Sequence, residues 1–123
     1  MGRLDGSISE RAERFAHRVL DVTDVLMRDR RPRRTIDQIT GSGTSVGANI
    51  YEADEAMSRP DFCKSLGIVI KELNETRFWL RLIVARKWIG NTRLAPLQEE
   101  AAELKRIFGS MLARTRKKDL GRD

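Results

Sequence analysis

The chain has 123 residues, of which 40% are hydrophobic and 34% are charged. A chain of this length can build one hydrophobic core and is too short for two domains. It contains no run of about 18 apolar residues, as a membrane span would need, and its first residues lack the apolar stretch of a signal peptide. Cys63 is the only cysteine, which excludes an internal disulfide and suits a reducing compartment. We therefore expect a single-domain cytoplasmic protein that does not enter a membrane.

The charge balance is basic: 24 Lys and Arg residues against 18 Asp and Glu residues give a formal net charge of +6. Most charges at this density lie on the solvated faces of helices. The excess nevertheless favours polyanions as partners over acidic proteins or neutral small molecules.

Apolar residues recur at the alternating spacings of three and four of a heptad repeat, which keeps them in one buried stripe of a helix. The four predicted stripes are Ile8, Ala12, Phe15, Val19, Val22 and Leu26; Ile36, Ile39, Gly43, Val46, Ile50, Ala53 and Met57; Phe62, Leu66, Val69, Leu73, Thr76, Leu80 and Ile83; and Leu94, Leu97, Ala101, Leu104, Phe108 and Met111. The first predicted helix covers residues 9–28, with Ser9 as its N-cap. It ends before Pro32, because the residue preceding a proline avoids helical geometry. The second covers residues 34–57 and ends before Ser58, which we expect to cap the next helix.

The third predicted helix covers residues 60–89, and Gly90 supplies a left-handed cap at its end. The fourth covers residues 94–116, with Pro96 in its first turn, where proline is tolerated. A basic tail follows at residues 117–123. Four striped helices joined by short connections predict an all-α, antiparallel up-down-up-down four-helix bundle.

In this topology the first and third connections share one end of the bundle, which gathers basic residues. The helix dipole accounts for cations at helix C-termini, such as Arg28 and Arg86, but disfavours Arg33 and Arg34 at a helix N-terminus. Two interpretations stay open, a dipole effect or a site for nucleic-acid phosphates. The candidate binding residues are Arg28, Arg30, Arg31, Arg33, Arg34, Arg86, Lys87 and Arg93.

A second basic cluster is expected at the opposite end. It is either a solubilising tail or another nucleic-acid contact. Its members are Arg114, Arg116, Lys117, Lys118 and Arg122.

The glycines from Gly41 to Gly47 suggest a phosphate-binding loop, but the pattern fails. Val46 stands where a dinucleotide fingerprint needs its third glycine, and the Gly-Lys-Ser/Thr of a P-loop is absent. We interpret these glycines as positions where two helices approach closely.

A polar stripe runs beside the apolar one on the second helix and faces polar residues on the third. The first interpretation is a buried hydrogen-bond network that fixes the helix register, because unpaired buried polar groups cost about 1–3 kcal/mol. The alternative is an acid/base site. The network is predicted from Ser45, Asn49, Glu52, Glu72 and Glu75, with Ser42 and Thr76 beside them.

Metal and nucleophile chemistry is poorly supplied. His17 is the single histidine and lies four residues after Glu13, whereas di-iron bundles use paired Glu-x-x-His motifs. We expect no metal, no cofactor and no catalytic residue, and thus no enzyme.

The third helix carries more apolar surface than one stripe requires. A helix that is apolar on most sides is buried on most sides, which predicts contact with another subunit. Aromatic side chains are enriched at such contacts, so Phe78, Trp79 and Leu82 are the predicted anchors. The alternative is that Trp79 covers a seam within the bundle.

A long motif resembles the four-helix-bundle proteins encoded in bacterial 23S rRNA intervening sequences. The resemblance spans about Phe15 to Met111, and Phe78 replaces the family's commoner tyrosine. The matching residues are Ser45, Ala48, Asn49, Ile50, Glu52, Ala53, Asp61, Phe62, Glu72, Glu75, Thr76, Trp79, Leu80 and Arg81.

This resemblance implies a cytoplasmic bundle that assembles as a homo-oligomeric ring, typically a pentamer, without an established enzymatic activity. A more distant similarity, in the segments Arg77–Arg81 and Gly109–Arg114, is to the accessory variability protein of diversity-generating retroelements. That relative is a basic pentamer that binds nucleic acid and a reverse transcriptase.

The sequence therefore predicts a non-enzymatic, ring-forming bundle whose basic end contacts RNA or DNA phosphates. The alternative is a protein-interaction scaffold, for instance an adaptor for a nucleic-acid enzyme such as a reverse transcriptase. A third possibility is an enzyme that uses Glu52, Glu72 and Glu75 in an open pocket.

Overall fold

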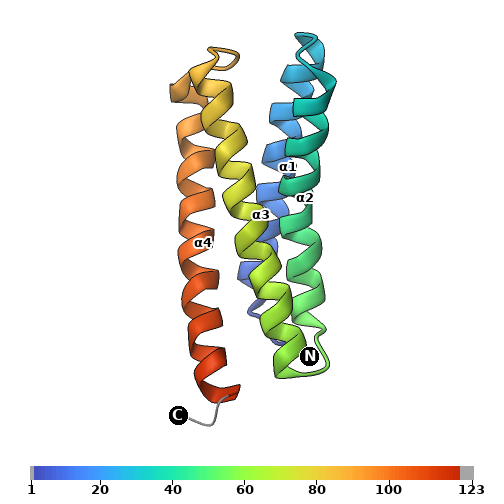
Figure 1. Cartoon of the computed structure of the whole chain (residues 1–123), viewed down its shortest axis with the longest axis vertical. Helices are drawn as coiled ribbons and strands as arrows, with labels where there is room; N and C mark the ends of the chain where they lie inside the picture. The colour runs from blue at the N-terminus through green and yellow to red at the C-terminus, as the bar shows by residue number, and fades with distance from the viewer. Residues whose placement is uncertain (1, 120–123) are drawn as a thin grey trace.

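The computed structural model describes residues 2–119. It consists of α1 (Gly6–Arg28), α2 (Arg33–Asp54), α3 (Arg59–Ala85) and α4 (Asn91–Asp119), packed side by side (Figure 1). These residues contain no strand, so the predicted all-α class with four helices is confirmed. None of the helices described is both long and apolar enough to cross a membrane.

The first helix begins earlier than predicted. Asp5, and not Ser9, is the N-cap of α1, and its carboxylate accepts a hydrogen bond of 3.0 Å from the backbone N–H of Ser7. The segment before α1 is tied to the end of α2, because Leu4 N–H donates to the Asp54 carboxylate at 2.7 Å. These contacts fix the residues that precede the first heptad position, so α1 begins before its apolar stripe does.

The second helix ends earlier than predicted, at Asp54 instead of Met57. Met57 was expected in the core stripe but is 92% exposed, because it lies beyond the end of the helix. Ser58 caps α3 as predicted, accepting a 3.2 Å hydrogen bond from the backbone N–H of Asp61.

The third helix also ends earlier than predicted, at Ala85 instead of Ile89. Lys87, and not Gly90, takes the left-handed conformation after the helix, with φ of 61°. Ile89 is buried in the core from the connection itself. The helix end was therefore predicted too late, because the apolar Ile89 contributes to the core from outside the helix.

The fourth helix is longer than predicted. It begins at Asn91 and ends at Asp119, so that Pro96 lies inside it. Gly90 C=O accepts hydrogen bonds from the N–H groups of Arg93 and Leu94 at 3.1 and 3.3 Å, which closes the first turn before the proline is reached.

The predicted stripes form a single core. Almost all of their members are buried, from Phe15 and Val19 on α1 to Leu104 and Phe108 on α4. Ile8 and Met111 are only partly buried and pack against the margin of this core. The heptad spacing therefore identified the interior face of each helix.

The glycines of α2 differ in their surroundings. A methyl group at Gly43 would collide with the buried side chain of Val19 on α1. At Gly47 it would lie 3.8 Å from the Ala16 side chain, in ordinary contact. Gly41 is exposed with nothing nearby, so of the three only Gly43 stands where the approach of the two helices leaves no room for a side chain, as predicted.

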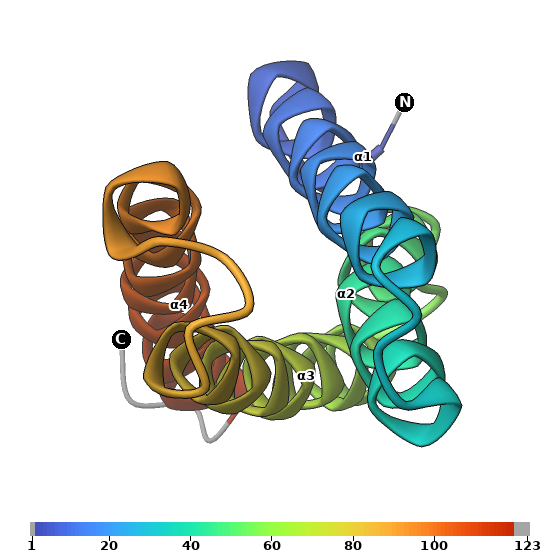
Figure 2. The ribbon, with the colours of Figure 1, turned by 90° about the horizontal axis from the view of Figure 1, so that it is seen from above.

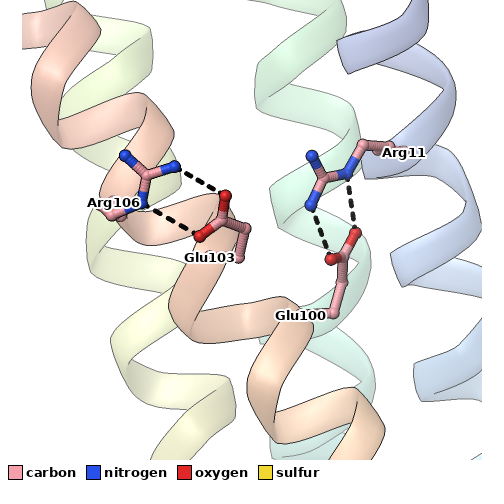
Figure 3. A network of polar contacts seen from close by, with 4 residues as sticks. All are labelled: Arg11, Glu100, Glu103 and Arg106. Carbon is pink, nitrogen blue, oxygen red and sulfur yellow. Dashed lines mark hydrogen bonds and ion pairs between the residues drawn. The ribbon is translucent and has the colours of Figure 1, made fainter.

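The helices are arranged in sequence order around the bundle. Consecutive helices pack along their lengths, whereas α1 and α4 touch at few positions (Figure 2). One of the links between α1 and α4 is a bidentate ion pair, in which Arg11 Nη2 and Nε donate to the Glu100 carboxylate at 2.7 and 3.1 Å (Figure 3). The second fork in this view, Arg106 with Glu103, lies within α4.

Candidate nucleic-acid interface

The α1–α2 and α3–α4 connections lie together at one end of the bundle (Figure 1). A direct contact joins them: the guanidinium of Arg31 lies over the ring of Trp88, 5.3 Å from its centroid. We call this the basic end. It contains the predicted residues Arg28, Arg30, Arg31, Arg33, Arg34, Arg86, Lys87 and Arg93.

Most of these side chains are free to meet a ligand. All of them except Arg31 are exposed. Among the residues described, the ion pair at this end is the one between Arg28 and Asp29, at 3.2 Å. The structure therefore brings the predicted residues together and leaves most of their charge without an acidic partner.

Two basic residues occupy strained, equivalent positions at this end. Arg30 follows α1 and Lys87 follows α3, both in the left-handed region, with φ of 57° and 61°. Each closes its helix in the same way: Arg31 N–H donates to Leu26 C=O at 2.9 Å, and Trp88 N–H donates to Ile83 C=O at 3.0 Å. Glycine is favoured at this position, and a side chain there costs about 1 kcal/mol.

Arg31 has a different role from its neighbours. Its side chain is half-buried against Trp88, and its Nε atom is buried without a hydrogen-bond partner. A stacked arginine of this kind contributes about 0.5–2 kcal/mol. Arg31 thus ties the two connections together, whereas the other predicted residues of the basic end are exposed.

The start of α2 adds backbone donors to the basic end. Its N-cap is Pro32, which makes no side-chain hydrogen bond, and its first turn contains no acidic residue. Unpaired N–H groups at a helix N-terminus carry partial positive charge and favour an anion. An anion bound here would also offset the repulsion between this terminus and the charges of Arg33 and Arg34.

The opposite basic cluster has a simpler explanation. Arg116, Lys117 and Lys118 lie in the last turn of α4, where the helix dipole favours cations. Arg114 is exposed one turn earlier. The predicted fifth member, Arg122, lies outside the described residues.

The predicted polar network is only partly formed. Thr76 on α3 donates a 2.9 Å hydrogen bond to the Ser42 hydroxyl on α2, which joins the two helices within the core. Asn49 donates to the hydroxyl and the carbonyl of Ser45, both at 2.9 Å. Burial, followed by the neighbouring charge of Glu75, raises the pKa of Glu72 above its ordinary range. The Ser42–Thr76 pair, which lies beside the predicted set, is therefore a buried register contact between α2 and α3.

The three carboxylates do not converge. Glu52 is exposed and lines a shallow pocket that contains neither Glu72 nor Glu75. Glu75 instead accepts a 3.2 Å hydrogen bond from the indole N–H of Trp79. Among the residues described, no cluster of three or more potential metal ligands is present.

The predicted interface anchors have different surroundings. Phe78 is 56% exposed, and Leu82 is half-buried beside it. Trp79 is partly buried and packs on the core, which matches the alternative prediction of a seam cover. Because α3 lies between α2 and α4, much of its surplus apolar surface is covered within the bundle.

Sequence reasoning missed a second apolar surface. Leu20 on α1 and Tyr51 on α2 are 36% and 58% exposed, and both line a shallow groove between these helices. The sequence did contain a signal for this surface. Leu20 and Tyr51 lie outside the heptad stripes, so they are large apolar residues expected on the surface.

Comparisons with known proteins agree on one family. A model of the family described as 23S rRNA-intervening sequence protein matches residues 5–110. The chain is also similar to a crystal structure from Bacteroides thetaiotaomicron VPI-5482, a protein of unknown function from the S23 ribosomal protein family. The TM-score is 0.82 with 32% sequence identity, and the match covers 85% of this chain and 97% of that one. No curated protein matches the chain.

Proposed function

Since the chain belongs to the 23S rRNA-intervening sequence protein family, as its motifs predict, we propose that it is a non-enzymatic, ring-forming bundle that binds nucleic acid. The basic end is the binding surface, and RNA or DNA phosphates are the ligand. The up-down-up-down course of the chain and a cytoplasmic location belong to the same proposal.

The observation that carries this proposal is the pair of left-handed cations, Arg30 and Lys87. Strained backbone positions cluster at functional sites. A glycine would relieve the strain at both positions, so the retained charged side chains point to a role outside the fold. Their equivalent placement in two neighbouring connections supports a single anionic ligand that spans both.

The chemistry favours phosphates over bases. Guanidinium and ammonium groups neutralise phosphates and release counterions, which gives affinity without reading sequence. A homo-oligomeric ring, pentameric by analogy with the family, would repeat the basic end in every subunit. Repeated weak contacts on one nucleic-acid strand then add through their effective concentration.

The test compares two variants with equal loss of charge. In the first, Arg30, Arg33, Arg34 and Lys87 become Gln; all four are exposed, so the fold should persist. In the control, the exposed residues of the opposite cluster become Gln, namely Arg114, Arg116, Lys117 and Lys118.

Fluorescence anisotropy with labelled RNA and DNA, over a series of salt concentrations, measures both affinity and its salt dependence. We expect the basic-end variant to bind more weakly, and its log–log salt slope to fall by about 0.7–0.9 per lost phosphate contact. The control should change little. Equal losses in both variants, or no binding by the wild type at low salt, would refute the proposal. Nuclease-resistant retention of one protein partner in that case would favour the scaffold alternative.

A further inference from the structure

Three of the large apolar residues exposed on the helices, Leu20, Tyr51 and Phe78, lie on two faces of the bundle, whereas Met27 lies near the end of α1 outside both. The first face is the groove between α1 and α2, bounded by Leu20 and Tyr51; we call it the α1–α2 groove. The second is a stripe along the outer side of α3 that includes Phe78 and Leu82; we call it the α3 ridge. Paired apolar faces on one molecule suggest that they cover each other between copies.

The α1–α2 groove is shallow because its floor consists of small residues. Ala16, Gly47 and Ala48 lie between the two large side chains. The hydroxyl of Tyr51 donates a 2.8 Å hydrogen bond to Glu13 on α1, which holds the ring across the groove. The result is an apolar depression with fixed walls.

The α3 ridge presents a supported aromatic side chain. Phe78 packs edge-on against Trp79, with ring centroids 4.9 Å apart. Trp79 is itself fixed by its hydrogen bond to Glu75. Rigid aromatic anchors lose little entropy on binding, which suits Phe78 to a pocket on a partner.

The two faces are lined by opposite charges. The residues that line the α1–α2 groove include the acidic Glu13 and no Lys or Arg. Residues 76–98, which include the ridge, contain no Asp or Glu, but five cations: Arg77, Arg81, Arg86, Lys87 and Arg93. Arg77 and Arg81 border the ridge directly. This complementarity favours a second copy of the chain over an unrelated partner.

The ridge at Phe78 lies close to the level of one end of the groove, at Thr44. The hydrogen bond between Ser42 and Thr76 sets these residues at one level. Phe78 lies two residues beyond Thr76 on α3, and Thr44, at one end of the groove, lies two residues beyond Ser42 on α2. Because α2 and α3 run in opposite directions (Figure 1), the two displacements add. At about 1.5 Å per residue the offset between Phe78 and Thr44 is only about 6 Å.

The two faces belong to neighbouring helices, because α2 lies between α1 and α3 around the bundle (Figure 2). A contact between two different faces is heterologous, and its repetition forms either a closed ring or an open filament. Because the two faces lie on neighbouring helices, each added copy is rotated relative to the previous one. The repeated contact can therefore close into a ring.

We propose that the α3 ridge of one copy docks into the α1–α2 groove of the next, with Phe78 between Leu20 and Tyr51. Arg77 and Arg81, which line the ridge, then lie beside a groove whose lining includes Glu13 and no Lys or Arg. The contact rests on the proposed function, for which it specifies how neighbouring subunits of the ring meet.

The experiment uses one variant for each face. Phe78→Glu places a charge on the ridge, and Leu20→Glu places one in the groove; both positions are exposed in the single chain, so each variant should fold. Multi-angle light scattering measures the mass of each variant alone and of their equimolar mixture. Met57→Glu, at an exposed position outside both faces, is the matched control.

We expect the wild type and the control to assemble, and each face variant alone to be monomeric. In the mixture, the intact groove of the Phe78→Glu protein can accept the intact ridge of the Leu20→Glu protein, but no further copy can add. The mixture should therefore give heterodimers and nothing larger. Circular dichroism checks folding, and Phe78→Ser with Leu20→Ser replaces the pair if either glutamate variant unfolds.

Two results would overturn the inference. An assembled wild type whose Leu20→Glu variant keeps its full mass would exclude the groove while leaving a ring possible. A mixture of the two variants that stays monomeric would exclude a ridge-to-groove contact. A monomeric wild type would overturn the ring itself, whereas nucleic-acid binding by the basic end is decided separately by the anisotropy experiment.

Discussion

Gly43 is the position at which the packing of α1 against α2 can be tested most directly. A methyl group there would lie 2.8 Å from Val19 Cβ and closer still to Val19 Cγ1. Val19 has no exposed surface, so its side chain has no free space into which to move. The same methyl group at Gly41, two residues earlier on the same helix, would meet nothing within 4 Å.

The magnitude follows from comparing Gly43→Ala with Gly41→Ala. Both variants gain about 0.5–1 kcal/mol from the better helix propensity of alanine. Only Gly43→Ala also overpacks the core, which costs about 1–3 kcal/mol. Because the propensity gain is common to both, the difference in unfolding free energy between the variants equals this overpacking cost.

Urea unfolding followed by circular dichroism, at one protein concentration, measures the difference. We expect Gly41→Ala to be more stable than wild type and Gly43→Ala to be the less stable of the two variants by about 1–3 kcal/mol. Adding Val19→Ala to Gly43→Ala should recover part of the loss, because it removes the colliding methyl groups. If Gly43→Ala unfolds at the same or a higher urea concentration than Gly41→Ala, the proposed close approach is wrong.

Three further predictions concern the polar contacts. The raised pKa of Glu72 means that the folded state binds more protons than the unfolded state. Stability should therefore fall as pH rises from about 4.5 through the folded-state pKa. Glu72→Gln should flatten this pH dependence of stability, measured as urea midpoints from pH 4 to 7. Thr76→Val should cost about 1 kcal/mol, because the Ser42 hydroxyl loses its interhelical partner, and the added change Ser42→Ala should recover most of the loss. A double-mutant cycle on Arg11→Met and Glu100→Gln should give a coupling of about 1 kcal/mol or less, which high salt reduces.

Each of these has its own control. The Glu75→Gln variant removes the neighbouring charge, which separates its effect on the pKa of Glu72 from that of burial. A fully additive pair at Ser42 and Thr76 would show that their hydroxyls do not interact. For Arg11 and Glu100, the control is a double-mutant cycle on the exposed Glu103–Arg106 ion pair. This pair lies within α4, so its coupling energy does not join two helices.

The sequence allowed the interior of this protein to be predicted almost residue by residue. Apart from Met57, the heptad positions from Phe15 to Phe108 are buried because their spacing keeps them on one side of a single helix, which is a local property. The Ser58 cap was predicted for the same reason, as its hydrogen bond reaches only three residues along the chain. The helix ends at Met57 and Ile89 were misplaced, because apolar residues in a connection can serve the core without extending the helix.

The candidate site was predictable only in part. Short connections were enough to place the two basic turns at one end. They did not reveal that Arg31 stacks on Trp88 while Arg30 and Lys87 take left-handed conformations, because these features arise where two separate connections meet.

The amino-acid sequence by itself determined the helical class, the inward face of each helix and the family, all of which follow from spacing and motif along one chain. Tertiary structure alone decided which surfaces remain for partners. Phe78 and Trp79 are neighbours in sequence and both lie off the stripe, yet one is exposed and the other packs on the core. The difference arises because α3 lies between α2 and α4, and the helices that cover a side chain are set by packing across the whole bundle.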